Sequence, residues 1–148
     1  MAMTKSVFVG GVQIGGGAAV KIQSMTTTKT SNVEETMAQI QALQNAGCEI
    51  VRVAVADETD AIAVKEVVSK IKIPLVADIH FSPKLAVMAI ENGAHKVRIN
   101  PGNIGGEREI AYVADCVKTH KIPVRVGANT GSIEKNFYKN TAKTNIRL

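Results

Sequence analysis

Short apolar segments alternate with amphipathic segments along most of the chain. The apolar segments, rich in β-branched residues, predict β-strands at 20–25, 50–55, 75–79, 95–99 and 124–127. Apolar residues at helical spacing predict helices in the stretches between them, at 31–46, 59–70, 83–93 and 107–119. Before the first of these strands, residues 6–14 predict a β-hairpin that turns at Gly10-Gly11. The alternation of strand and helix is typical of an α/β domain with buried parallel strands.

Three sequence signals mark helix ends. Ser31 and Glu34 have the spacing of a capping box, which predicts that the first helix begins there. Gly47 predicts the end of that helix, because glycine readily adopts the left-handed conformation that follows a helix. Ser82 followed by Pro83 predicts the start of the third helix.

The strands begin about 25 residues apart, which is the repeat of a (β/α)₈ barrel of about 250 residues. The chain has 148 residues. We therefore expect an incomplete TIM-type (β/α) barrel, with about five βα units preceded by an N-terminal β-hairpin. An open parallel sheet of five strands would fit the same pattern.

Composition narrows the class of protein. The chain is 45% hydrophobic and 21% charged, as in soluble globular domains, and it has no apolar run long enough for a membrane span. No signal-peptide pattern is found at the start, so we expect a cytoplasmic protein. The net charge is +5, but much of it comes from the tail residues Lys135, Lys139, Lys143 and Arg147. With only 3% aromatic residues, we expect no nucleic-acid partner.

Arginines interrupt three of the predicted strands. Arg52, Arg98 and Arg125 are each flanked by β-branched residues. A single arginine of this kind would be expected to pair with a carboxylate or to reach out to solvent. Three at equivalent positions, with Asp78 as the one strand carboxylate near them, instead predict a positively charged cavity, because an unpaired buried charge is costly.

Other polar residues share the faces of these arginines. Residues two apart on a strand point the same way, so Asn100 accompanies Arg98, Asn129 accompanies Arg125, and His80 accompanies Asp78. Since the guanidinium group matches phosphate oxygens, we expect a phosphate or diphosphate ligand. Cys48 and Cys116 are too few for a cysteine metal site, and we interpret both as packing residues.

Four ordered motifs carry a family resemblance. Residues 47–55, 76–81, 97–105 and 125–129 resemble barrel strands of the 4-hydroxy-3-methylbut-2-enyl diphosphate synthase family, and 20–26 resembles its first strand. The resemblance extends from about Val7 to Lys135. It implies a barrel that binds a diphosphate with arginines at its strand ends. The matching positions here are Arg52, Asp78, His80, Arg98, Asn100, Arg125 and Asn129.

The resemblance also implies a reaction. The family reductively opens 2-C-methyl-D-erythritol 2,4-cyclodiphosphate to the linear allylic diphosphate, in non-mevalonate isoprenoid biosynthesis. Electrons come from flavodoxin or ferredoxin through a [4Fe-4S] cluster, held by three cysteines and one glutamate of a C-terminal domain. Neither cysteine of this chain matches a cluster ligand, so no metal ligand is expected in it, and no catalytic residue is assigned.

The chain departs from the family pattern after Lys135. We therefore interpret residues 1–148 as a partial N-terminal barrel domain without the C-terminal iron–sulfur domain, inactive alone. Exposed strand edges favour a homodimer. Two alternatives stay open: a barrel similar to the pterin-binding synthases that acts on another anionic substrate, and a non-catalytic half-barrel scaffold.

Overall fold

A computed structural model describes residues 4–127. The first two strands, β1 (Val7–Val9) and β2 (Val12–Ile14), form an antiparallel hairpin. The next five form one parallel sheet: β3 (Gln23–Met25), β4 (Ile50–Val55), β5 (Leu75–Ile79), β6 (Lys96–Ile99) and β7 (Val124–Val126). The helices are α1 (Val33–Asn45), α2 (Glu58–Lys70), α3 (Pro83–Glu91), the short α4 (Pro101–Ile104) and α5 (Glu107–His120).

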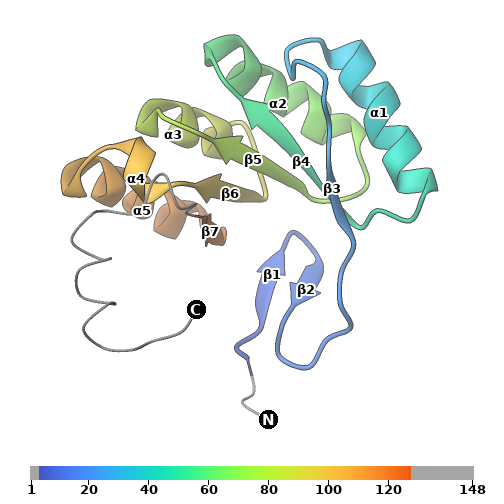
Figure 1. Ribbon diagram of the computed structural model, residues 1–148, viewed down its shortest axis with the longest axis horizontal. Coiled ribbons are helices and arrows are strands. Elements are labelled where there is room, and N and C mark those ends of the chain that lie inside the picture. Colours follow the sequence, from blue (N-terminus) through green and yellow to red (C-terminus); the bar gives the residue numbers. More distant parts are fainter. Residues whose placement is uncertain (1–3, 128–148) are drawn as a thin grey trace, which may run out of the picture.

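The order of the strands distinguishes a barrel from an open sheet. The parallel strands are neighbours in the order in which they occur along the chain, from β3 to β7. The sheet curves, and α1, α2, α3 and α5 cover its convex face (Figure 1). A doubly wound sheet would reverse its strand order and place helices on both faces. The described part is therefore an arc of a (β/α) barrel, as the sequence predicted.

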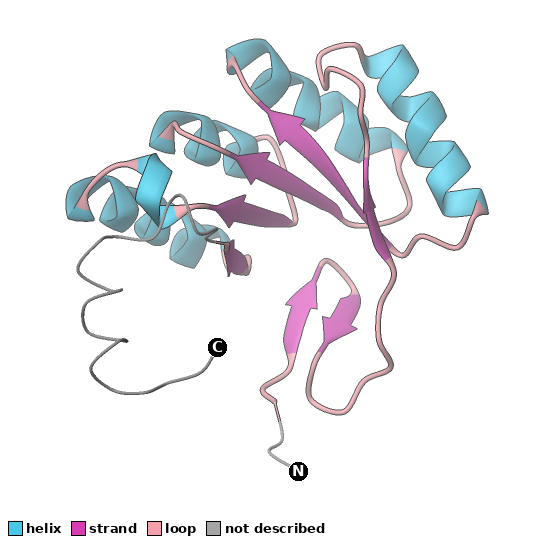
Figure 2. Ribbon diagram, viewed as in Figure 1, coloured by secondary structure: helices cyan, strands magenta, loops and turns pink. Residues whose placement is uncertain are grey.

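The main hydrophobic core lies between the sheet and the helices. Every second residue of each long strand points toward the helices, as the pleat of a strand requires. The core contains Val51, Val53, Val55, Leu75, Ala77, Ile79, Val97 and Ile99 from the sheet, with Ile40, Val64, Ile90 and Val113 from the helices. The intervening residues face the opposite, concave side of the sheet, where Figure 2 shows no helix from residues 4–127.

The N-terminal hairpin covers part of the concave face. Val9 is fully buried and forms a second apolar cluster with Ile50 of β4 and Val76 of β5. The hairpin turn packs closely against Pro74, the residue before β5, because a Cβ added at Gly10 would lie 3.0 Å from Cγ of Pro74. Gly10 also has a φ of +55°, so the turn needs glycine for its backbone as well. The predicted hairpin is confirmed, and the fold shows where it packs.

Most predicted boundaries agree with the structure to within two residues, but the start of the first barrel strand and the cap of the first helix do not. The first barrel strand begins at Gln23 rather than 20, because Glu49 binds the backbone N–H of Ile22 and the ammonium of Lys21. The predicted cap at Ser31 is wrong. Asn32 caps α1 instead and accepts from the Glu35 N–H.

The other two predicted helix ends are confirmed. Gly47 follows α1 with a φ of +90°. The Ser82 hydroxyl accepts from the Leu85 N–H at the start of α3.

Within residues 4–127, no helix combines the length and apolarity that a bilayer crossing needs.

Candidate functional site

The charged residues of the strands share the concave face of the sheet. Asp78 of β5 is opposite Arg98 of β6, and Arg98 is opposite Arg125 of β7. Arg52 lies on β4 two residues before Ala54, which is opposite Asp78. Because side chains two residues apart share a face, the sheet brings all four charged side chains to its concave side.

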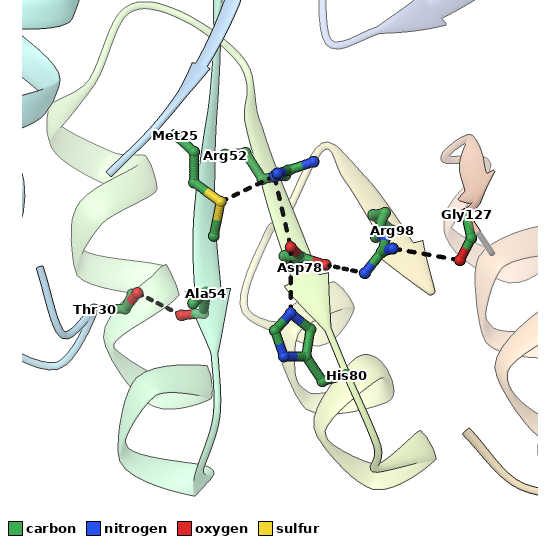
Figure 3. Close-up of polar contacts among 8 residues, drawn as sticks. All are labelled: Met25, Thr30, Arg52, Ala54, Asp78, His80, Arg98 and Gly127. Atoms are coloured by element: carbon green, nitrogen blue, oxygen red, sulfur yellow. Dashed lines mark hydrogen bonds and ion pairs between the residues drawn. The ribbon is translucent and has the colours of Figure 1, made fainter. Parts of the chain in front are cut away.

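Asp78 is the centre of this arrangement (Figure 3). Its side chain is 4% exposed, and its Oδ1 lies 3.1 Å from Nη1 of Arg98. Its Oδ2 lies 3.6 Å from Nε of Arg52 and 3.5 Å from Nε2 of His80. One buried carboxylate therefore holds two arginines from the neighbouring strands on either side.

Each arginine has a second contact that restricts its guanidinium. Arg52 donates through Nε to Sδ of Met25 at 3.2 Å, so both of its contacts fall on the same nitrogen. Arg98 donates through Nη2 to the carbonyl of Gly127 at 3.3 Å. Within the part of the chain that the structure describes, Nη1 and Nη2 of Arg52 take part in no hydrogen bond or ion pair. Those nitrogens remain available as donors to a bound anion.

Lys96 is a further cation on this face that the sequence reasoning missed. It precedes Arg98 by two residues on β6, and it lines a cavity of about 440 Å³ together with Arg125 and Gln23. Burial, and secondly the charge of Arg125, lower the pKa of Lys96. The alternation that grouped Asn100 with Arg98 also predicts the position of Lys96, so the signal was present.

Two other predicted residues occupy less central positions. His80 follows β5 and is 53% exposed, with its ring edge-to-face against Phe81 at a centroid distance of 6.0 Å. Asn100 is 2% exposed, and its side-chain oxygen accepts from the Gly102 N–H at 3.2 Å to cap α4. The structure therefore gives Asn100 a role in shaping the loop. Asn129 lies outside the described residues.

Loops at the same edge of the sheet are joined by a buried carboxylate. Asp60 is 2% exposed and accepts from the backbone N–H of Ser31 at 2.8 Å and of Ala56 at 3.1 Å. The hydroxyl of Thr30 donates to the carbonyl of Ala54, which ties the β3–α1 loop to the end of β4 as well. These contacts link the β3–α1 loop to the β4–α2 loop beside the arginines.

The charges of the site do not balance. We define the concave-face cluster as Arg52, Asp78, Lys96, Arg98 and Arg125. Four cations and one carboxylate leave an excess of three positive charges on one surface. Forked guanidinium donors beside such an excess favour a ligand with several anionic oxygens. Chemically, the arrangement can bind and orient a polyanion.

The cysteines are not placed to hold a metal cluster. Cys48 is buried and its thiol donates to the carbonyl of Ile50 at 3.0 Å. Cys116 lies on α5, outside the sheet, where its Sγ is 3.6 Å from Nδ1 of His120. Burial raises the pKa of the Cys116 thiol, which opposes the thiolate form that metals bind. Within residues 4–127, no three His, Cys, Asp or Glu side chains gather as a metal site.

Comparison with known proteins gives one family. The model of the GcpE TIM-barrel domain matches residues 4–147, so the expected departure from the family after Lys135 is wrong. The chain is 54% identical over 135 residues to 4-hydroxy-3-methylbut-2-en-1-yl diphosphate synthase (flavodoxin) of Caldicellulosiruptor saccharolyticus, covering 91% of this chain and 39% of that protein. It is 58% identical over 133 residues to the Thermotoga maritima protein of the same name, covering 90% and 38%. The chain thus spans about two fifths of the length of these relatives.

Solved structures share the fold at low identity. Dihydropteroate synthase of Yersinia pestis superposes with a TM-score of 0.65 at 9% identity, covering 94% of this chain and 53% of that one. The enzyme from Xanthomonas albilineans gives a TM-score of 0.60 at 14% identity, covering 94% and 56%. These matches support the barrel architecture.

Proposed function

The chain belongs to the GcpE TIM-barrel family, and from this premise we propose that it forms the substrate-binding part of a 4-hydroxy-3-methylbut-2-en-1-yl diphosphate synthase. The proposed substrate is 2-C-methyl-D-erythritol 2,4-cyclodiphosphate, whose phosphate oxygens supply the polyanion that the site favours. The observation that carries the proposal is the concave-face cluster, in which Asp78 holds Arg52 and Arg98 side by side.

In this proposal the residues of the chain bind and orient the substrate. Arg52 donates to phosphate oxygens through its two terminal nitrogens. Arg98 donates through the N–H groups that are not bound by Asp78 or Gly127. Arg125 and Lys96 add positive charge on the neighbouring strands. His80, exposed beside Asp78, lies where a bound substrate would contact the edge of the site. Asn129 belongs to the same proposal through the family motif alone.

The redox part of the reaction requires residues other than these. A [4Fe-4S] cluster would supply the electron transfer that this reaction needs, but Cys48 and Cys116 do not fit such a cluster. In this proposal the cluster ligands are not residues of this chain. Flavodoxin, which the names of the relatives include, is the proposed electron donor. A cytoplasmic homodimer is part of the same proposal.

The family comparison also weighs against a pterin substrate. The dihydropteroate synthases share the fold at 9% and 14% identity, whereas the diphosphate synthases are 54% and 58% identical to this chain. Identities as low as those to the dihydropteroate synthases indicate a shared fold and not a shared substrate, which depends on the residues of the site.

Calorimetric titration of the 148-residue chain with the cyclic diphosphate tests the proposal. Loss of one charge-assisted contact costs about 1.5–3 kcal/mol, so Arg98→Ala should weaken binding roughly ten- to a hundredfold. Arg108→Ala, on the exposed surface of α5, removes the same charge and is the matched control, with a change of less than about twofold. If the two variants bind alike, or if a pterin diphosphate binds more tightly than the cyclic diphosphate, the proposal is wrong.

A further inference from the structure

Gly127 immediately follows β7 and hydrogen-bonds to two neighbouring residues of β6, Ile99 and Arg98. Its N–H donates to the carbonyl of Ile99 at 2.9 Å, which extends the pairing of β6 with β7. Its carbonyl accepts from Nη2 of Arg98 at 3.3 Å. The backbone of Gly127 lies outside the left-handed region, so the main-chain conformation does not require glycine at this position. Another reason is needed for a residue without a side chain.

The space that a side chain would fill is occupied by the guanidinium of Arg98. A Cβ added at Gly127 would lie 2.9 Å from Nε, 3.1 Å from Nη2 and 3.4 Å from Cζ of Arg98. These three atoms are its nearest neighbours, and all belong to one planar group. The guanidinium therefore packs directly against the Cα of Gly127. From there it also reaches Asp78, at 3.1 Å through Nη1.

We propose that Gly127 is a positioning residue for Arg98 in diphosphate binding, an inference that rests on the proposed function. The missing side chain lets the guanidinium bridge Asp78 and the Gly127 carbonyl, which fixes its plane beside Arg52. Arginine has five N–H donors, and this bridge uses two of them. The other three keep a fixed orientation for the anion. A methyl group at 127 would displace the guanidinium, because the arginine side chain moves more easily than the paired backbone.

The first test compares two glycine substitutions. Gly127→Ala should weaken the binding of inorganic pyrophosphate about five- to thirtyfold, somewhat less than complete removal of the arginine contact. Gly11→Ala is the matched control, because an added Cβ at Gly11 meets no atom within 4 Å and Gly11 also lies outside the left-handed region. We expect the control to stay within about twofold of the parent.

A double-mutant cycle separates positioning from general damage to the strand. If Gly127 acts through Arg98, then Gly127→Ala should change pyrophosphate affinity by less than about twofold in an Arg98→Ala background. A purely structural effect would weaken binding by the same factor in both backgrounds. That result would overturn the inference, as would unchanged affinity of Gly127→Ala in the parent chain.

A measurement without ligand keeps this inference distinct from the proposed function. The Nε–H resonance of Arg98 can be assigned in nitrogen-15 NMR spectra from its loss in Arg98→Ala. It should shift in Gly127→Ala and stay in place in Gly11→Ala. If the resonance shifts but pyrophosphate does not bind the parent, the contact is confirmed and the proposed diphosphate site fails, which removes the binding role of Gly127 with it. An unshifted resonance overturns the inference directly.

Discussion

Replacing Asp78 with asparagine keeps the volume of the side chain and removes its charge, leaving Arg52 and Arg98 without their shared carboxylate. Removing one partner of a buried ion pair typically costs about 3–5 kcal/mol. The two arginine side chains are 26% and 20% exposed, so water compensates part of this loss. We therefore expect Asp78→Asn to lower the free energy of unfolding by about 2–3 kcal/mol, and the melting temperature by roughly 5–10 °C.

Urea denaturation followed by circular dichroism measures this difference. Asp115→Asn is the control, because its side chain is 78% exposed and lies 3.7 Å from the Lys118 ammonium. A surface pair of this kind contributes less than about 0.5 kcal/mol. In an Arg98→Met background, the cost of Asp78→Asn should fall by about half, since one of its two arginine partners is already gone. If Asp78→Asn unfolds within about 0.5 kcal/mol of the parent, Asp78 does not hold the arginines as argued.

Two further predictions concern residues outside the concave-face cluster. Burial lowers the pKa of His95 in the folded chain below its ordinary value of 6.5. As the pH falls below 6.5, the unfolded chain therefore binds a proton at His95 before the folded chain does, and the free energy of unfolding decreases. The His95→Asn side chain can still accept a hydrogen bond but does not titrate. Between pH 7 and pH 5, its free energy of unfolding in urea should therefore fall less than that of the parent, and an equal fall would contradict this reasoning. Asp60→Ala removes the acceptor for the Ser31 and Ala56 N–H groups and should cost about 2–4 kcal/mol in the same assay, against less than about 0.5 kcal/mol for the exposed Glu66→Ala.

The strands were predictable because their burial follows from residue type. The strands at 50–55 and 75–79 have the predicted boundaries, since each is a continuous run of mostly β-branched or apolar residues with polar residues or proline next to it. The first barrel strand was predicted too long, because Glu49 binds Lys21 and Ile22 across the fold. The cap at Ser31 failed for a similar reason, since its N–H is bound by Asp60 in the first turn of α2. Local patterns contain no information on such partners.

The site was predictable to the extent that it depends on alternation within strands. The convergence of Arg52, Asp78 and Arg98 is confirmed by their ion pairs. The contacts of Met25 and Gly127 depend on the register between neighbouring strands, which the alternation within each strand does not give. Asn100 shares a face with Arg98 in sequence, but its oxygen is used by the adjacent turn.

The alternation along β4 and β6 also has a consequence for how the chain avoids misfolded pairings. A slip of one residue in either strand would turn every side chain to the opposite face of the sheet. Arg52 or Arg98 would then enter the apolar layer between the sheet and the helices, where an unpaired charge costs several kcal/mol. The arginines that suit an anion thus destabilise incorrect registers, while burial of Val51 and Val53 stabilises the native register. Replacing the arginines with apolar residues would therefore remove a determinant of strand register along with the anion site.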